Sequence, residues 1–203
     1  MTPQIAFLID KALQNLTAGN FEVAKSHLNE VLKIDPKNTH ALRFVGIIYA
    51  QQSNWSQAKN FFAQAISADP ENGIAYSNLG NVLSELKQYE EAIKNYDQAI
   101  AIEPRYAEAY SNKGNALSEL KQYEEAIKNY DQAIAIEPRY AEAYSNKGNA
   151  LSELKQYEEA IKNYDQAIAI EPRYAEAYSN KGNALSELKQ YEEALFNINQ
   201  ALN

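Results

Sequence analysis

The sequence predicts an all-α solenoid built from about six helix-turn-helix repeats of 34 residues, and three observations support this fold class. The stretch Ala107–Tyr140 recurs without one change as Ala141–Tyr174. Gly73–Tyr106 is a near copy, and Ala175–Ala194 repeats the first twenty residues. A fixed period of ~20–50 residues is typical of arrays in which each repeat is one supersecondary unit that buries its apolar face on its neighbours. The same spacing separates five prolines: Pro36, Pro70, Pro104, Pro138 and Pro172.

The first two repeats are expected to be helical but differ from the others in sequence. Thr2-Pro3 favours a helix start, because a hydroxyl N-cap precedes a proline at the first helical position. Gly19-Asn20 predicts the turn to a second helix, which runs from Phe21 to about Ile34 and ends before Pro36. Atypical terminal repeats are common in solenoids, so we expect one solenoid over residues 1–203 rather than several domains. Its repeats are expected at 5–38, 39–72, 73–106, 107–140, 141–174 and 175–203.

Each regular repeat is expected to contain a first helix, helix A, and a second helix, helix B. The apolar positions of helix A recur every three or four residues, as do those of helix B. Gly114 lies within the helix A stripe, where a glycine destabilises the helix by about 1 kcal/mol relative to alanine, so we expect a close helix contact there. The predicted ranges of helix A are 73–86, 107–120, 141–154 and 175–188, and those of helix B are 89–102, 123–136, 157–170 and 191–202.

The repeat resembles the tetratricopeptide repeat family. It carries Tyr110-x2-Lys113-Gly114-x2-Leu117, then Ala126-x3-Tyr130, then a proline, in the order of that family's aromatic, Leu-Gly, aromatic, Ala, aromatic and Pro pattern. The resemblance implies a right-handed superhelix with helix A of each repeat lining the concave face. It also implies an interaction protein without catalytic residues of its own.

Composition excludes several other classes of function. The net charge of −8 argues against a nucleic-acid-binding basic stripe, and there is no cysteine for disulfides or thiolate chemistry. His27 and His40 have no third ligand in a metal-binding spacing, so no metal or cofactor is expected. No apolar run approaches the roughly 18 residues of a membrane span, and no signal peptide is recognisable. We therefore expect a cytoplasmic protein that is not an enzyme and binds neither membranes nor nucleic acid.

One face of helix A is polar and is the candidate peptide-binding site. In one repeat it reads Glu108, Ser111, Asn112, Asn115, Ser118 and Glu119, without Lys or Arg. Each carboxamide offers both donors and an acceptor, so in-register rows of asparagine can grip the backbone of an extended peptide. The structural alternative is that these residues are only solvated. The asparagines of the two rows are Asn78, Asn112, Asn146 and Asn180 beside Asn81, Asn115, Asn149 and Asn183. The acidic groove residues are Glu108, Glu119, Glu142, Glu153 and Glu176.

The regular repeats are most similar to the tetratricopeptide arrays of O-linked N-acetylglucosamine transferase. Those arrays carry an asparagine two residues before the Gly, as in Tyr76-Ser77-Asn78-Leu79-Gly80-Asn81-Val82-Leu83. The implied partner is an extended protein segment that is neutral or basic, because the predicted groove is acidic. Two alternatives stay open: the recognition arm of a longer glycosyltransferase-like enzyme, and an engineered or recently expanded structural array.

Three further expectations concern charged and apolar side chains. Lys113, Lys147 and Lys181 are expected to lay their stems along the helix contact with the ammonium groups in water. Glu124 and Lys128 are expected to pair on the outside of helix B. Near the C-terminus an apolar face is expected to be covered by further residues or by a second chain, in an end-to-end dimer. That face comprises Leu195, Phe196, Ile198 and Leu202.

Overall fold

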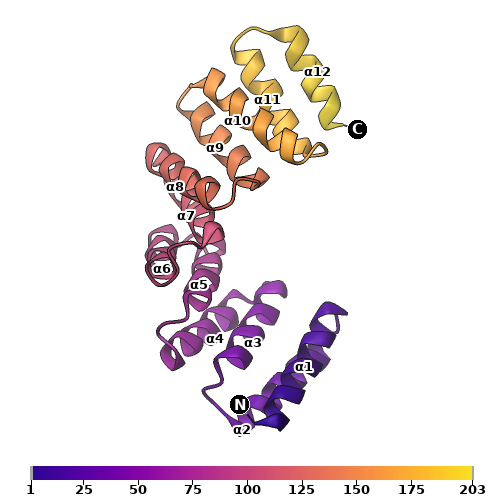
Figure 1. Cartoon of the computed structure of the whole chain (residues 1–203), viewed down its shortest axis with the longest axis vertical. Helices are drawn as coiled ribbons and strands as arrows, with labels where there is room; N and C mark the ends of the chain where they lie inside the picture. Colours follow the sequence, from indigo (N-terminus) through magenta and orange to yellow (C-terminus); the bar gives the residue numbers. More distant parts are fainter. Residues whose placement is uncertain (1, 203) are drawn as a thin grey trace. The chain divides into compact units, whose positions relative to one another are not determined.

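The computed structural model describes residues 2–202, which form twelve α-helices and no strand (Figure 1). The chain divides into two compact units, Met1–Pro104 and Arg105–Asn203. The first unit contains α1 (Pro3–Thr17), α2 (Phe21–Ile34), α3 (Thr39–Gln51), α4 (Trp55–Ala68), α5 (Gly73–Glu85) and α6 (Tyr89–Ile102). The second contains α7 (Ala107–Glu119), α8 (Tyr123–Ile136), α9 (Ala141–Glu153), α10 (Tyr157–Ile170), α11 (Ala175–Glu187) and α12 (Tyr191–Ala201).

The helix ends confirm the boundaries that the sequence predicts to within one residue. Thr2 caps α1, its Oγ1 accepting from the Ile5 backbone N–H at 3.3 Å, with Pro3 at the first helical position. Two residues beyond the end of helix A in each later repeat, the backbone φ is positive, for example 59° at Lys121 and 60° at Lys155. That left-handed residue reverses the chain into helix B, although it is not glycine in these repeats.

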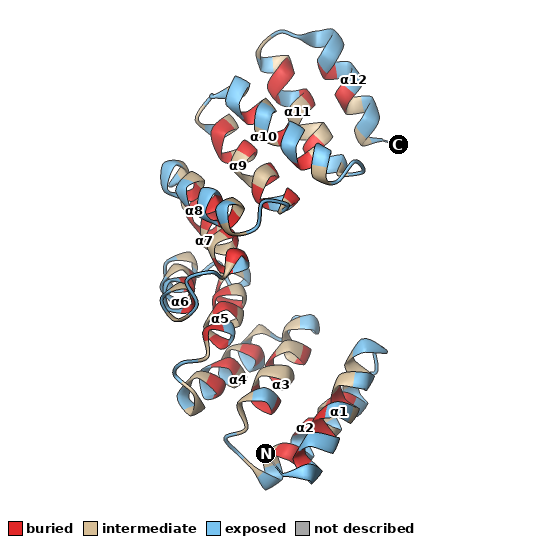
Figure 2. Ribbon diagram, viewed as in Figure 1, coloured by how far each residue is buried: buried red, intermediate tan, exposed pale blue. Residues whose placement is uncertain are grey.

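Within each unit the helices pack as consecutive antiparallel pairs. In the first unit α1 packs on α2, α3 on α4 and α5 on α6, and α2 and α4 also contact the helix A that follows them. The second unit repeats this arrangement with α7–α8, α9–α10 and α11–α12, and α8 and α10 contact α9 and α11. Buried residues lie on the faces where helices meet, as the red segments in Figure 2 show.

A glycine allows the close contact between the two helices of a repeat. A Cβ built on Gly114 would lie 2.6 Å from Cε1 of Tyr130, and the same is true of Gly148 and Tyr164. Tyr130 and Tyr164 are each 1% exposed. The expectation that Gly114 marks a close approach is therefore confirmed, and the group it makes room for is the tyrosine ring of helix B.

Helix A is more deeply buried than a single apolar stripe indicates. Ala143 and Ser145 of α9 are completely buried and Ala150 is 2% exposed, because α9 contacts both its own helix B, α10, and the preceding one, α8. Ser111, at the same helix position as Ser145, is also completely buried, so placing it on the solvated groove face was wrong. Among residues 2–202, no helix is long and apolar enough to cross a membrane.

Two expected charge contacts are also corrected. Lys128 pairs with Glu125 at 2.7 Å, not with Glu124. The ammonium groups of Lys147 and Lys181 do not simply reach water: they bind Asp131 at 2.6 Å and Asp165 at 2.7 Å, carboxylates on the preceding helix B. These pairs tie adjacent repeats together at the protein surface, where each contributes at most about 1 kcal/mol.

Candidate functional site: asparagine-lined pockets between repeats

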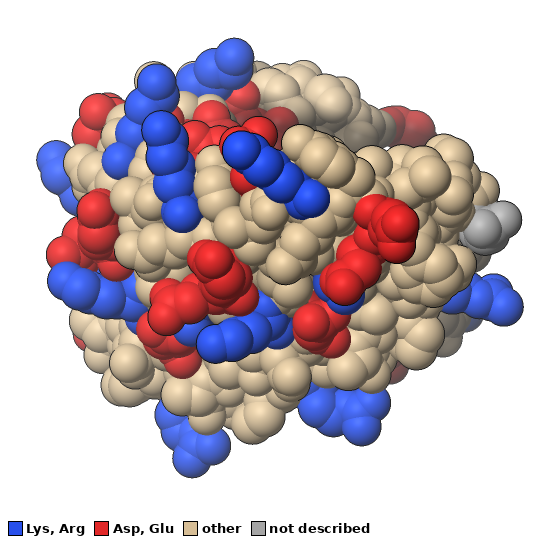
Figure 3. All heavy atoms as spheres, turned by 90° about the horizontal axis from the view of Figure 1, so that it is seen from above, with Lys and Arg blue, Asp and Glu red and all other residues tan. Residues whose placement is uncertain are grey.

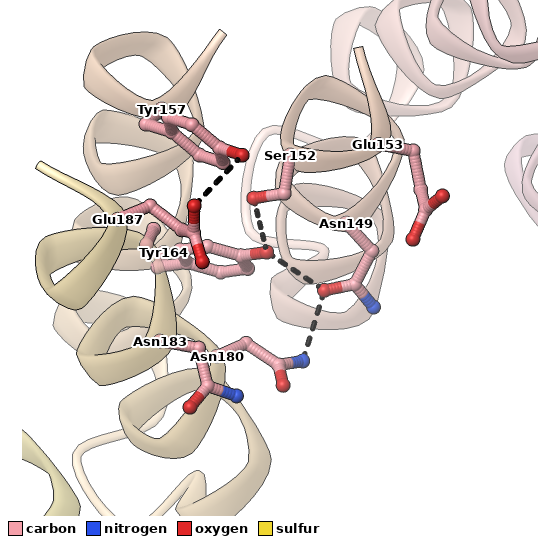
Figure 4. Close-up of a pocket in the computed structure, with 9 residues that line it drawn as sticks. Asn149, Ser152, Glu153, Tyr157, Tyr164, Asn180, Asn183 and Glu187 are labelled. Carbon is pink, nitrogen blue, oxygen red and sulfur yellow. Dashed lines mark hydrogen bonds between the residues drawn. The ribbon is translucent and has the colours of Figure 1, made fainter. Parts of the chain in front are cut away.

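In the second unit, hollows lie where helix A and helix B of one repeat meet helix A of the next. The hollow between α9, α10 and α11 has a volume of about 510 Å³ and is lined by asparagine, serine, tyrosine and glutamate side chains (Figure 4). An equivalent hollow of about 450 Å³ lies between α7, α8 and α9. Both belong to the second unit, in which the repeats are identical or nearly so.

Asn149 is the centre of a hydrogen-bond network in the first of these hollows. Its Oδ1 accepts from the Tyr164 hydroxyl at 2.9 Å and from Nδ2 of Asn180 at 2.9 Å (Figure 4). The Ser152 hydroxyl lies 3.2 Å from the Tyr164 hydroxyl. Because the single hydroxyl proton of Tyr164 goes to Asn149, Ser152 is the donor to Tyr164. The network therefore links the predicted rows of asparagine to each other and to helix B.

The same network occurs one repeat earlier. Oδ1 of Asn115 accepts from the Tyr130 hydroxyl at 2.8 Å and from Nδ2 of Asn146 at 3.0 Å. In the first unit, the Tyr96 hydroxyl donates to Asn81 at 2.8 Å. An asparagine ladder is thus present, and its side chains hold one another in place.

The ladder leaves a defined set of hydrogen-bonding groups available. Oδ1 of Asn149 already accepts two hydrogen bonds, so this side chain offers a ligand only its two Nδ2 protons. The same holds for Asn115. Asn180 and Asn146 each use one amide proton and keep the other, together with Oδ1. The available groups are therefore both donors and acceptors, as the backbone of an extended peptide requires.

The ends of the ladder differ from its middle. Asn183 is exposed, and because Ile198 stands where the preceding repeats have tyrosine, no helix B hydroxyl donates to it. Nδ2 of Asn78 is buried without a hydrogen-bond partner, because Ile47 stands where Asn115 and Asn149 stand in later repeats. Asn112 lies partly buried on α7.

Acidic side chains surround both hollows. Glu119, Glu142 and Glu153 line the one between α7, α8 and α9, and Glu153 and Glu187 line the next. Two of these carboxylates are fixed from helix B: Tyr123 donates to Glu153 at 3.2 Å and Tyr157 donates to Glu187 at 3.4 Å. The other two acidic candidates, Glu108 and Glu176, are exposed on helix A but line neither hollow.

Burial and negative charge keep the network tyrosines protonated. Burial raises the pKa of Tyr130 to about 12, and Glu142 and Glu119 add to the rise. Burial likewise raises the pKa of Tyr164 to about 12, with Glu176 and Glu153 contributing. Both hydroxyls therefore remain hydrogen-bond donors throughout the physiological range.

The sequence indicated the asparagines of the site but not the residues that form hydrogen bonds with them. Tyr130 and Tyr164 look like ordinary packing residues at helical spacing, and nothing in the sequence places their hydroxyl groups beside an asparagine on the neighbouring helix. One signal was available: the tyrosine, serine and asparagine recur together at one period and are all replaced together in the second repeat.

The charged side chains that line the two hollows of the ladder are acidic, and no Lys or Arg lines either one. Among the described residues, 2–202, no cluster of three or more His, Asp or Glu side chains could hold a metal ion. On the face in Figure 3, basic and acidic side chains are interspersed rather than separated into a basic stripe.

The apolar face near the C-terminus is exposed in part. Leu195 and Phe196 are each 61% exposed, and Leu202 is 81% exposed. Ile198 differs from the expectation: it turns inward, and its Cγ1 lies 2.6 Å from a Cβ built on Gly182. Tyr191, which the helical spacing assigns to the same face, is 64% exposed. In the preceding repeat, Tyr157 and Ile161 at the corresponding positions pack into a core with Ala184 of α11.

Comparison with known proteins agrees with this architecture. Family models described as tetratricopeptide repeat match residues 15–83, 71–139 and 129–162, and one described as TPR repeat matches 148–189. No curated protein gave a sequence match.

Solved structures of such proteins superpose well. MamA is similar with a TM-score of 0.72 and 25% identity over 78% of this chain and 92% of its own. YrrB, described as a TPR protein with an unusual peptide-binding site, is similar with a TM-score of 0.69 and 26% identity, over 84% of this chain and 88% of its own. PilF from Pseudomonas aeruginosa has a TM-score of 0.85 and 20% identity, over 96% of this chain and 88% of its own. This is a likeness of fold alone. Repeat length, helix pairing, the glycine–tyrosine contact and these matches together show that the chain belongs to the tetratricopeptide repeat family.

Proposed function

We propose that this protein is a non-catalytic interaction scaffold that binds an extended segment of another protein along the asparagine-lined face. The observation that carries the proposal is the hydrogen-bonded ladder of the second unit, Asn115 to Asn146 and Asn149 to Asn180. The ladder fixes each carboxamide before a ligand arrives, so little side-chain entropy is lost on binding. The peptide-binding site in the description of YrrB supports the same function class.

The charge around the ladder favours a neutral or basic segment. Glu119, Glu142, Glu153 and Glu187 line the two hollows, and no Lys or Arg side chain does. A C-terminal carboxylate or an acidic peptide would meet like charge there. Binding is expected to weaken as salt is raised, because exposed charges are screened over about 10 Å at 0.1 M ionic strength.

Replacing Asn146→Ala together with Asn180→Ala tests the ladder. These two side chains keep both donor and acceptor capacity for a ligand, and removing them leaves Asn115 and Asn149 bonded to their tyrosines. Each peptide hydrogen bond is worth about 0.5–1.5 kcal/mol, so binding is expected to weaken by about fivefold or more from a micromolar or weaker starting value. The dissociation constants are measured by fluorescence anisotropy with labelled, unstructured peptides, some neutral and some basic.

A matched control removes asparagines outside the ladder. Asn95 and Asn163 lie on helix B, where each donates only to a backbone carbonyl of its own helix. Asn95→Ala with Asn163→Ala is expected to bind peptides as the unchanged protein does. If the ladder variant and this control bind the same peptides equally well, the ladder is not the binding surface.

The exposed face of α12 supports a second proposal, self-association through Leu195, Phe196 and Leu202. Burying a Phe side chain is worth about 1.5–3 kcal/mol, so Phe196→Lys is expected to weaken such a dimer by at least about tenfold. Light scattering over a concentration series measures it. A strict monomer at high micromolar concentration, with and without the substitution, would end this idea.

A further inference from the structure

The first unit contains a hollow at the same place in the repeat, but with different chemistry. It lies between α3, α4 and α5 and has a volume of about 330 Å³, near the lower end of the ~300–1,000 Å³ range of ligand pockets. Four lining residues replace polar counterparts from the hollow between α9, α10 and α11. Ile47, Ala50, Trp55 and Phe62 stand where Asn149, Ser152, Tyr157 and Tyr164 stand three repeats later.

These replacements remove the hydrogen-bond network and leave an apolar wall. Phe62 is 2% exposed and packs with Val82 in one cluster, against which Ile47 and Trp55 lie. Phe62 has no hydroxyl to donate, and Ile47 has no oxygen to accept. The floor of the hollow is therefore hydrocarbon and aromatic ring, and the apolar side chain of a ligand would be buried against it.

One polar group in this hollow is left unsatisfied. Nδ2 of Asn78 is buried and has no hydrogen-bond partner within residues 2–202. Its counterpart three repeats later, Nδ2 of Asn180, donates to Asn149 at 2.9 Å. A buried amide donor without an acceptor is unfavourable, and a ligand carbonyl at this point would satisfy it.

The rim carries an acidic group that the fold does not use. Glu85 lines the hollow, and in the part of the chain that the structure describes it has neither an ion pair nor a hydrogen bond. The equivalent Glu187 accepts from Tyr157, but Trp55 in the tyrosine position makes no such bond to Glu85. No Lys or Arg lines the hollow, so its charge complements a cation.

We propose that this hollow is a side-chain-selecting subsite for a large apolar residue next to a Lys or Arg in an extended partner segment. The apolar side chain lies against Ile47, Trp55 and Phe62, Asn78 donates from Nδ2 to a carbonyl of the segment, and Glu85 pairs with the neighbouring cation. The subsite rests on the proposed function in one respect, that the ligand is an extended peptide. It adds a preference for sequence, which the asparagine ladder alone does not provide.

Trp55 makes the subsite directly observable, because it is the single tryptophan of the protein. Two uncharged-ended host peptides serve as probes, Ac-Ser-Gly-Ser-Leu-Lys-Ser-Gly-NH2 and the same peptide with Ser in place of Leu. Total binding is measured by calorimetry and occupancy of the hollow by Trp55 emission. The Leu peptide is expected to bind at least tenfold more tightly and to change Trp55 emission, and the Ser peptide to leave the emission unchanged.

A triple substitution converts the hollow to the polar type found elsewhere in the chain. Ile47→Asn, Ala50→Ser and Phe62→Tyr introduce the residues that later repeats already carry, and Asn78 gains an acceptor. The preference for Leu is expected to fall below about twofold and the Trp55 response to disappear, with helicity by circular dichroism unchanged. Asn78→Ala provides a second, smaller change, for which Leu-peptide binding is expected to weaken at least threefold.

The outcomes separate the subsite from the ladder. One outcome overturns the subsite but leaves the proposed function standing. In it, both peptides bind with equal affinity and do not change Trp55 emission, while their binding is weakened by Asn146→Ala with Asn180→Ala. A Trp55 response and Leu preference that survive in that ladder variant support the subsite, and an overall affinity that the ladder variant leaves unchanged counts against the ladder. Absence of heat and of any emission change with both peptides overturns both.

Discussion

Asn149 and Asn183 occupy the same position in successive repeats, yet only one of them is integrated into the fold. Asn149 accepts hydrogen bonds from Tyr164 and Asn180, whereas Asn183 is exposed and Ile198 stands in the place of its tyrosine. The contribution of the network to stability can therefore be measured at Asn149 and compared with that of an equivalent asparagine outside the network.

Asn149→Ala is expected to lower the free energy of unfolding by about 1–3 kcal/mol, because it removes the acceptor of two hydrogen bonds. Asn183→Ala makes the same chemical change at the equivalent helix position and is expected to alter the free energy of unfolding by less than about 0.5 kcal/mol. Urea unfolding of both variants measures the difference. Equal effects would show that the network contributes nothing to stability.

The buried tyrosines predict a loss of stability in alkaline solution. The pKa values of Tyr130 and Tyr164 are raised to about 12 from an ordinary value near 10, so between these pH values the folded state binds more protons than the unfolded state. The stabilisation of neutral tyrosine is complete below about pH 10 and is lost as the pH rises to 12. Each tyrosine accounts for roughly 2–3 kcal/mol of this loss.

The test is the dependence of the unfolding free energy on pH between 9 and 12. In Tyr164→Phe the decline is expected to be shallower, because one titrating group has been removed. An identical slope with and without Tyr164 would mean that its hydroxyl ionises in the folded state as easily as in water.

At the scale of the helices, the N-termini of helix B differ in capping. Asn54 precedes α4, and its side chain accepts from the Gln57 backbone N–H at 3.3 Å. At the same position before α8 stands Gln122, whose side chain makes no capping hydrogen bond. The longer side chain of glutamine is a poor N-cap, so the first turn of α8 is weaker than that of α4.

Gln122→Asn is therefore expected to raise the free energy of unfolding by about 0.5–1 kcal/mol. The reverse change, Asn54→Gln, is expected to lower it by a similar amount, and chemical denaturation measures both. An effect of the same sign in both variants would show that the capping side chain does not determine the stability of this turn.

Helix positions were predictable from this sequence because the signals are local and repeated. The prolines end helix B, and apolar residues at helical spacing mark each face. The hydrogen-bond partners were not predictable, because they join different helices: the Tyr164 hydroxyl meets Asn149 only when α10 packs on α9, and Lys147 meets Asp131 only when α9 packs on α8. Burial of Ser111 was missed for the same reason, since periodicity in one helix does not reveal how many neighbours it has.

The apolar hollow of the first unit shows how repeats improve such predictions. Ile47 and Phe62 look unremarkable alone, but each replaces a residue that is polar in the later repeats. Comparison of a repeat with its own copies indicates which positions have changed, and only the structure shows that the changed positions line one pocket.

At the scale of the molecule, the contacts within each unit are between neighbouring helices, with a few between the first helices of adjacent repeats: α3 with α5, α7 with α9 and α9 with α11. Deleting Ala141–Tyr174 removes α9 and α10 and joins α8 to α11, whose sequence is that of α9. The interface between α8 and α9 is thereby rebuilt with the same residues.

This deletion is expected to leave a folded protein with unchanged helicity per residue and a lower melting temperature, because stability in repeat arrays is approximately a sum over repeats and their interfaces. Circular dichroism and thermal melting measure both quantities. Loss of cooperative unfolding after this one deletion would contradict the dependence on neighbouring contacts.

NMR of the side-chain amides of the asparagines tests directly whether the ladder of the second unit binds the backbone of an extended segment. The protein, labelled with ¹⁵N, is titrated with an unstructured basic peptide while the Nδ2 signals of Asn115, Asn146, Asn149 and Asn180 are followed, with Asn95 and Asn163 as internal references. Saturable shifts of the four ladder signals at one common dissociation constant are expected, with none at the references. Saturable binding that moves backbone signals elsewhere but leaves the four ladder amides unchanged would contradict this expectation.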